Sequence, residues 1–183
     1  MDSLSRLKLL GTWVNMNELV AIDQMRKHQP VQDTHFERPI IVPTDAFDGL
    51  IDFTNCQFTE FRCQCVQVFS PVKFENCSFE NAHFHGTYFY GGLLMRNCTV
   101  KGRLGFECGG HNDNGEFALI DCRFTELVDF ADCWFTGPFS LKNVTFQNGT
   151  NLLGNIGTPV SVTFDVPPRL TAVTGQRDRN TYR

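Results

Sequence analysis

The sequence lacks the features that would place it in several common functional classes. No apolar run reaches the length of about 18 residues that a transmembrane helix needs, and the N-terminus has no apolar segment typical of a secretory signal. The formal net charge is −4, which excludes the strongly basic footprint of a nucleic-acid-binding protein. The phosphate-binding loop and the hydrolase motifs Gly-x-Ser-x-Gly and His-Glu-x-x-His are also missing. We therefore expect a cytoplasmic protein without enzymatic activity, cofactor, membrane contact or direct contact with nucleic acid.

Tyr and Trp are scarce, at three and two residues, whereas Phe contributes 18 of the 183 residues. The sequence also contains eight Cys residues. A chain of this length buries a core without disulfide bonds, and the lack of a secretory signal favours a reducing compartment. The cysteines are therefore expected to be free thiols, and the distribution of Phe becomes the feature to explain.

Large apolar residues recur every five residues over much of the chain. In the stretch KFENCSFENAHFHGTYF they are Phe74, Phe79, Phe84 and Phe89. A step of five fits neither the period of a helix nor that of a strand. With an occasional step of six, the full series of these core positions is Phe53, Phe58, Cys63, Val68, Phe74, Phe79, Phe84, Phe89, Met95, Val100, Phe106, Leu119, Phe124, Phe130, Phe135, Leu141, Phe146 and Leu152.

Each five-residue unit predicts one side of a coil. A second apolar residue stands two positions before most core residues, and side chains two apart in an extended segment point the same way. Asn, Asp or Gly often follows two positions after the core residue, as at Asn76 and Gly86, and these residues tolerate turn conformations. The hexapeptides FTNCQF, FENCSF and MRNCTV begin 21 residues apart, so four units make one coil.

The units CSFEN-AHFHG-TYFYG and the hexapeptides above resemble the pentapeptide-repeat family, over roughly 105 of the 183 residues. The resemblance implies an all-β fold, a right-handed quadrilateral parallel β-helix, here with about four to five coils. The family favours Asp or Asn just before the core residue, whereas this chain has residues such as Lys73, His83 and Tyr88 there. A more generic parallel β-helix is the alternative form.

The ends of a solenoid expose an apolar cross-section and need caps. The expected segments are a helical N-terminal cap with a lead-in strand at 1–48, the β-helix at 49–157 with an inserted loop at 108–116, and a C-terminal strand with a basic tail at 158–183. In the cap, Ser3 is expected to start one short helix, and Asn15 or Asn17 a second that runs to about His28. The tail is expected to be mobile or held by a partner.

Four cysteines raise the question of a metal site. Cys56, Cys77, Cys98 and Cys122 occupy the same position of successive coils, so they should form a ladder inside the rod. A zinc site needs four ligands that converge tetrahedrally on one ion, whereas thiols stacked ~4.8 Å apart lie in a line. Cys also behaves as a small apolar residue in cores. We therefore expect packing rather than metal binding or redox chemistry.

Candidate contact residues are outward side chains of the repeats, the inserted loop and the tail. The loop CGGHNDNGE has too few acids for a calcium cage, and it is either a plain surface loop or a contact with a partner. The full set of candidates is His83, His85, Tyr88, His111, Asn112, Asp113, Glu126, Asp129, Arg177 and Arg179.

A rigid rod is well suited to binding, because a preordered backbone loses little conformational entropy. The resemblance implies a particular version, since some pentapeptide-repeat proteins mimic duplex DNA and bind type II topoisomerases such as DNA gyrase and topoisomerase IV. Between 49 and 155 there are eleven acids and seven bases, a net of −4, whereas duplex DNA of similar length carries on the order of a dozen charges. Mimicry therefore requires that the acids gather on one face. We expect a non-enzymatic protein that binds a protein partner, and the alternative is an assembly protein that forms oligomers, with a homodimer through the C-terminal region.

Overall fold

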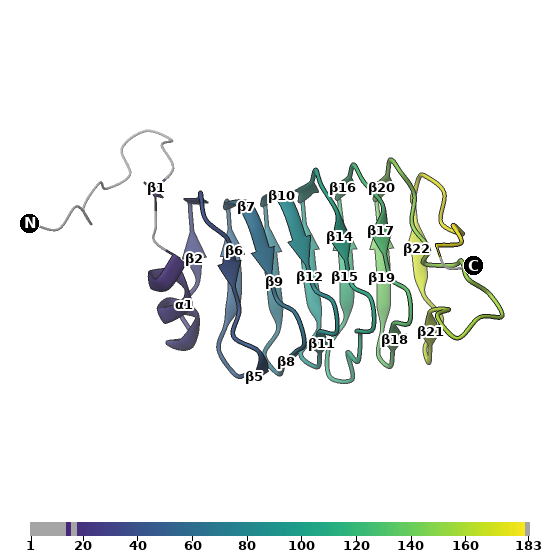
Figure 1. Ribbon diagram of the computed structural model, residues 1–183, viewed down its shortest axis with the longest axis horizontal. Helices are drawn as coiled ribbons and strands as arrows, with labels where there is room; N and C mark the ends of the chain where they lie inside the picture. The colour runs from purple at the N-terminus through teal and green to yellow at the C-terminus, as the bar shows by residue number, and fades with distance from the viewer. Residues whose placement is uncertain (1–13, 16–17, 182–183) are drawn as a thin grey trace, which may run out of the picture.

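The strands wind into a parallel solenoid of about five turns, and a short helix lies at the N-terminal end of the described solenoid (Figure 1). The computed structural model describes residues 14–15 and 18–181. Within that range every strand pair is parallel. The predicted parallel β-helix is therefore confirmed as a stack of coils.

The strands of the coils form three groups along the rod, and the ten-stranded group takes two strands from several of the coils. A seven-stranded sheet contains β2 (Val31–Gln32), β6 (Ile51–Thr54), β9 (Val72–Glu75), β12 (Leu93–Arg96), β15 (Phe117–Ile120), β19 (Phe139–Lys142) and β22 (Arg169–Thr171). A ten-stranded sheet contains β1 (Val14–Asn15), β3 (Thr34–Phe36), β4 (Ile40–Ile41), β7 (Gln57–Arg62), β10 (Ser78–His83), β13 (Thr99–Val100), β14 (Leu104–Gly105), β16 (Arg123–Phe124), β17 (Val128–Asp129) and β20 (Thr145–Phe146).

The remaining side consists of short strands along the lower edge of Figure 1. These strands are β5 (Asp45–Phe47), β8 (Val66–Val68), β11 (Tyr88–Phe89), β18 (Trp134–Phe135) and β21 (Thr163–Phe164). Gly110 forms bridges to Tyr88 on one side and to Trp134 on the other, and so joins the two groups of strands into one column.

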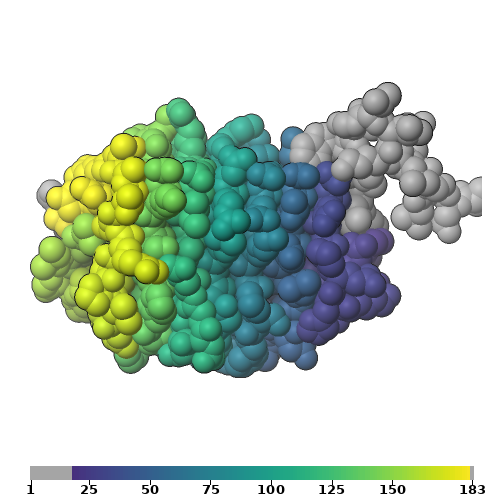
Figure 2. Space-filling view, turned by 180° about the vertical axis from the view of Figure 1, so that it is seen from behind, coloured from purple at the N-terminus to yellow at the C-terminus, as the bar shows by residue number. Residues whose placement is uncertain are grey.

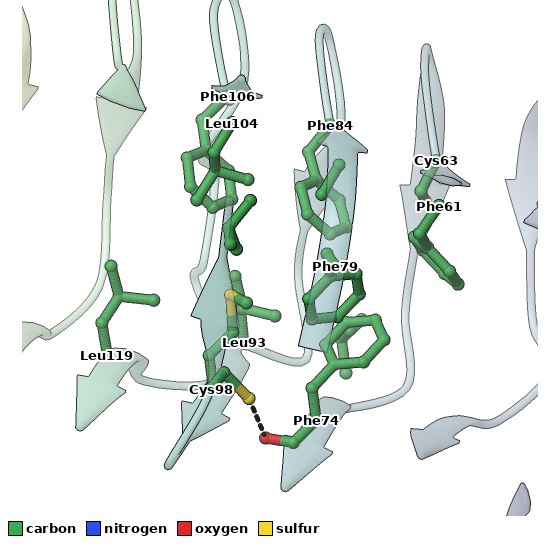
Figure 3. Packing of buried hydrophobic residues seen from close by; sticks show 14 of the residues in the cluster. Phe61, Cys63, Phe74, Phe79, Phe84, Leu93, Cys98, Leu104, Phe106 and Leu119 are labelled. Carbon is green, nitrogen blue, oxygen red and sulfur yellow. Dashed lines mark hydrogen bonds between the residues drawn. The ribbon is translucent and has the colours of Figure 1, made fainter. Parts of the chain in front are cut away.

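The predicted core positions all lie inside the rod. Every residue of the five-step series from Phe53 to Leu152 is buried. Phe58 stacks on Phe79 of the next coil with a centroid distance of 4.7 Å and an interplanar angle of 8°. Phe84 and Phe106 repeat this arrangement at 5.2 Å and 8°, and Figure 3 shows part of the resulting column. The repeat in the sequence is therefore the repeat of the packing.

The predicted corners are formed by an asparagine ladder. Asn55, Asn76 and Asn97 have φ angles of 55°, 53° and 51°, in the left-handed region that Asn tolerates best after Gly. The side-chain amide of Asn76 donates to Oδ1 of Asn55 at 3.0 Å, and the amide of Asn97 donates to Oδ1 of Asn76 at 2.8 Å. The residue type that makes the turn thus also links each coil to the next.

The inserted loop departs less from the repeat than expected. Tyr88 and Leu93 are five residues apart, whereas Gly110 and Phe117, which pair with them in the next coil, are seven residues apart. The loop therefore inserts two residues (7 − 5) into the repeat.

Asn112, in the inserted loop, lies inside the rod and is fully buried. Its amide donates to the carbonyls of Gly115 and Pro138 at 3.0 and 2.8 Å, and its oxygen accepts from the backbone N–H of Gly137 at 3.1 Å. The proposal that the Asn112 side chain contacts a partner is therefore wrong, because all of its hydrogen bonds lie inside the fold.

The solenoid extends beyond both predicted boundaries. Parallel pairing already begins at β1 and β2, which pair with β3 and β6, and β21 and β22 continue it past residue 157. Helix α1 (Glu18–Arg26) confirms the second predicted helix and buries Ala21 and Met25 at the N-terminal end of the rod. The helix predicted from Ser3 lies outside the described residues.

The basic tail lies against the last coil, in contrast to the expectation of a mobile or partner-held segment. The carbonyls of Gln176 and Arg177 accept hydrogen bonds from Thr150 and Leu153, both at 2.8 Å, and the backbone N–H of Arg179 donates to Thr150 at 3.1 Å. In Figure 2 the yellow C-terminal segments cover this end of the rod. The tail therefore continues the coil stack through its backbone.

Replacing a stacked interior ring by a charge should unfold the protein. In Phe79→Asp a carboxylate would lie among aromatic rings without a hydrogen-bond partner, which is strongly unfavourable. We expect a cooperative loss of the β signal in circular dichroism and a much lower melting temperature. Phe69→Asp is the matched control, because Phe69 is 54% exposed and should tolerate the same change. Equal melting temperatures for the two variants would contradict the inward placement of Phe79.

Candidate functional site

Five aromatic rings form a continuous row on the outside of the short-strand side. Phe69 stacks on Tyr90 with centroids 5.3 Å apart and an interplanar angle of 16°. Tyr90 contacts Tyr88 at 6.1 Å, and Tyr88 contacts His111 at 4.2 Å. His111 in turn lies 5.3 Å from Trp134. We call these five residues the aromatic row.

The alternation of inward and outward residues builds the row. Tyr88 and Trp134 immediately precede the buried Phe89 and Phe135, so their side chains point outward in the same column. Between them stands Gly110, which has no side chain, and the ring of His111 lies between Tyr88 and Trp134 in its place. The left-handed φ of His111, 52°, is part of this local rearrangement. A break in the repeat thus completes the row instead of interrupting it.

The aromatic row is exposed, whereas nearly all of the other Phe side chains are buried. Trp134 is 46% exposed and Phe69 is 54% exposed, while Tyr88, Tyr90 and His111 are half-buried. Every Tyr and Trp among the described residues belongs to the row, since Trp13 and Tyr182 fall outside that range. Tyr and Trp are enriched in protein interfaces, where they bury large area at little entropic cost. Their concentration here marks this surface as the leading candidate for binding.

The same side carries only negative charge. It is formed by the segments 44–50, 64–71, 86–92, 108–116, 132–138 and 161–168, which contain no Lys or Arg. The same segments contain six acids, all exposed, namely Asp45, Asp48, Asp113, Glu116, Asp132 and Asp165. Within the part of the chain that the structure describes, Glu116 is the one acid of this set in an ion pair, with Arg169 at 2.6 Å. We call this surface, including the aromatic row, the aromatic side.

The other sides alternate acids with bases. On the seven-stranded sheet, Lys73 lies 2.8 Å from Glu75, which also pairs with Arg96 at 2.7 Å. On the ten-stranded sheet, Lys101 pairs with Glu80 at 2.7 Å. These ion pairs connect side chains of the same coil or of neighbouring coils, so the acids and bases on these two sheets largely neutralise each other. The negative charge that a partner would meet is therefore concentrated on the aromatic side.

A second polar cluster lies where the ten-stranded sheet meets the C-terminal coil. The guanidinium of Arg103 donates to the carboxylate of Glu107, and it also reaches Oδ2 of Asp129 at 3.5 Å. Both carboxylates are largely buried, and the Glu107 side chain occupies the space that a side chain at Gly105 would fill. A hollow of about 610 Å³ beside the cluster is lined by Glu126, Arg179 and other residues.

Asp129 belongs to the structure of this cluster and not to the outer surface. It is 3% exposed, and its Oδ1 accepts from the backbone N–H of Ala131 at 3.0 Å and from the amide of Asn151 at 2.6 Å. The expectation that Asp129 faces a partner is therefore wrong. The side chain is held inward because Glu107 and Arg103 lie over it and Asn151 bonds to it from the next coil.

The remaining predicted contact residues fall into three places. Tyr88 and His111 touch each other in the aromatic row, and Asp113 is exposed on the same side. His83 lies 3.3 Å from Glu60 on the ten-stranded sheet, and His85 is exposed nearby at the edge of a smaller hollow. Glu126 and Arg179 line the larger hollow, and Arg177 is half-buried in the docked tail.

Sequence reasoning missed Phe69, Tyr90 and Trp134. The sequence could have identified Trp134, because it stands just before the core residue Phe135, as Tyr88 stands just before Phe89. Phe69 and Tyr90 each follow a core residue directly, and their alignment depends on the register of β8 and β11. The stacking of rings from neighbouring coils is what identifies the row.

The cysteine ladder is confirmed as part of the core. Each of its thiols lies within hydrogen-bonding distance of a carbonyl in the preceding coil: Cys56 to Val31, Cys77 to Phe53, Cys98 to Phe74 (Figure 3) and Cys122 to Met95. Elsewhere in the core, burial raises the pKa of the Cys63 thiol to about 12 and raises that of Cys133 as well. Thiols held protonated in this way are poor nucleophiles and poor metal ligands.

Two further observations bear on the class of protein. Among the described residues, no group of three or more His, Cys, Asp or Glu side chains is arranged to hold a metal ion. The short helix α1 cannot cross a membrane, and no other helix occurs in the described ranges.

The fold and the surface define the chain as a parallel β-solenoid with one aromatic, acidic side. A scan against protein-family models returned no match, and searches among curated proteins and among solved structures found none either. The pentapeptide-repeat resemblance therefore rests on the sequence units alone.

Removing the buried carboxylate of the polar cluster should destabilise the fold. Asp129→Ala leaves the N–H of Ala131 and the amide of Asn151 without this acceptor. We expect the free energy of unfolding to fall by at least about 2 kcal/mol in urea titrations followed by circular dichroism, since each unsatisfied buried group costs roughly 1–3 kcal/mol. Asp113→Ala removes an exposed carboxylate and should change it by less than about 0.5 kcal/mol. Similar losses in both variants would contradict a structural role for Asp129.

Proposed function

We propose that the protein is a non-enzymatic binding protein that engages a protein partner through the aromatic side. The observation that carries the proposal is the row of five contacting rings, two of them about half exposed, on a rod that buries nearly all of its other Phe residues. An exposed aromatic surface of this kind is costly in water unless a partner covers it part of the time. The strands beneath the row keep the rings in place, so binding requires little ordering of the protein.

Photo-crosslinking from two matched positions tests the proposal. Gln67 is exposed beside Tyr88 on the aromatic side, and Gln147 is exposed after β20 on the ten-stranded sheet. A photoreactive amino acid at Gln67 should yield a discrete adduct with another protein in cells of the native host, and the same residue at Gln147 should not. Mass spectrometry of the adduct identifies the partner. Adducts of equal yield at both positions, or none at Gln67, would contradict binding through the aromatic side.

A more specific version of the proposal is a DNA mimic that modulates a type II topoisomerase, as the pentapeptide-repeat resemblance implies. The segregation of charge supports it, because mimicry requires that acids gather on one face and the aromatic side has six acids and no Lys or Arg. The charge is still lower than that of DNA, which carries one charge per ~1.7 Å.

Supercoiling by DNA gyrase measures this version directly. Micromolar protein should inhibit the reaction or protect the enzyme, and the double variant Asp48→Asn/Asp113→Asn should act at severalfold higher concentration. Glu80→Gln is the control, because Glu80 lies on another side and pairs with Lys101. Unchanged supercoiling at micromolar protein would rule out the gyrase version and leave the broader binding proposal in place.

Assembly into oligomers is the second candidate, and the C-terminal end favours it. Val162, Phe164, Leu170 and Val173 occupy the last coil and are partly buried, while Ile156 is 84% exposed. A second copy placed against this end would bury these side chains, which corresponds to the predicted homodimer through the C-terminal region. Light scattering on a sizing column distinguishes a dimer from a monomer.

A further inference from the structure

We propose that the aromatic side binds an arginine-bearing, positively charged segment of its partner. The inference rests on the proposed function, and it adds the chemical class of the segment that the row receives. It follows from three features of the surface, namely the spacing of the rings, the sign of the surrounding charge and the acceptors at the edge of the row.

The row has the dimensions of a short extended peptide. From Phe69 to Trp134 it crosses three coil intervals, which at ~4.8 Å each span roughly 14 Å. An extended segment of four to five residues covers about this length. Alternate side chains of such a segment point the same way and lie about 6.6 Å apart. Neighbouring ring centroids lie 4.2 to 6.1 Å apart, so each of these alternate side chains would find a ring within reach.

The surrounding charge favours a cation. Asp48 lies one coil before Phe69, Asp113 stands two residues after His111, and the carboxylate of Asp165 accepts a hydrogen bond from Trp134 Nε1 at 2.9 Å. The aromatic side has no Lys or Arg to neutralise these groups, apart from Arg169 at its border, which pairs with Glu116. A single-stranded nucleic acid would be repelled here, although exposed aromatic rings are its usual platform. A neutral sugar would stack on the rings but would gain nothing from the net charge.

Arginine fits this combination better than lysine. The faces of aromatic rings attract cations within about 6 Å, and the planar guanidinium also stacks on them. Its N–H groups remain free to donate to a carboxylate at the rim of the row, such as that of Asp113 or Asp165. The structure therefore combines on one surface the two groups that recognise arginine, a ring face and a nearby acid.

Fluorescence anisotropy with labelled synthetic peptides tests the inference on the full-length protein. The probes are a nine-residue peptide that alternates Arg with Ser, the same peptide with Lys, and the same peptide with citrulline, which keeps the shape of Arg but has no charge. Cellohexaose and a fifteen-residue oligothymidylate, each added as a competitor and as a labelled probe, represent the neutral and anionic alternatives. We expect the Arg peptide to bind more tightly than the Lys peptide, the citrulline peptide to bind at least tenfold more weakly, and added salt to weaken binding.

Variants then locate the site. Trp134→Ala and Tyr90→Ala should each weaken the Arg peptide by roughly two- to fivefold, the effect of one exposed cation–π contact. The triple variant Phe69→Ala/Tyr90→Ala/Trp134→Ala should abolish measurable binding while circular dichroism stays native. Asp48→Asn/Asp113→Asn should also weaken it, whereas Glu80→Gln, which removes a negative charge from another side, should not.

The outcomes separate the inference from the proposed function. Binding of cellohexaose or oligothymidylate in preference to the Arg peptide, equal binding of the citrulline peptide, or a triple variant that binds normally would each overturn the inference. A partner crosslinked at Gln67 but no binding of the Arg peptide would overturn the inference alone. Failure of crosslinking at Gln67 would instead overturn the proposed function.

Discussion

The structure depends on one constraint: the side chains inside each coil must stack on the equivalent side chains of the next. Phe58 on Phe79 and Phe84 on Phe106 illustrate this, with ring planes within 8° of parallel. A shift of one residue in any coil would turn these rings outward, because side chains alternate along a strand. The interior therefore fixes the register of every parallel strand pair, and the corner asparagines support the same register with side-chain hydrogen bonds.

Once the interior is in register, the outside is in register as well. The residue that precedes an inward Phe must point outward, so Tyr88 and Trp134 are aligned by the burial of Phe89 and Phe135. The acidic residues on the same side are kept apart from the bases for the same reason, since each position in the repeat belongs to one side of the rod. A surface suited to binding thus arises from packing that has no direct role in recognition.

The departures from the repeat shape both clusters on the surface. Gly110 leaves a gap in the outer column, and the ring of His111 lies there between Tyr88 and Trp134. Gly105 leaves a second gap, which the carboxylate of Glu107 occupies beside Arg103. In the inserted loop, Asn112 is fully buried and satisfies its polar groups with three backbone partners. Each irregularity is compensated locally, so the coils on either side remain stacked.

The sequence by itself determined the interior, the corners and the coil length. Each unit needs a large buried residue, such as Phe79, and many units need a residue that tolerates a left-handed turn, such as Asn76. Because these requirements are local and recur in every coil, they appear as a periodic pattern in the sequence. Only the tertiary structure decided which outer residues meet, because contacts such as Phe69 with Tyr90 join coils about 21 residues apart, the distance between successive repeats. It also decided the inward placement of Asn112 and Asp129, which look like surface residues in the sequence. Their burial depends on hydrogen-bond partners in neighbouring coils, and no pattern within one unit reveals those partners.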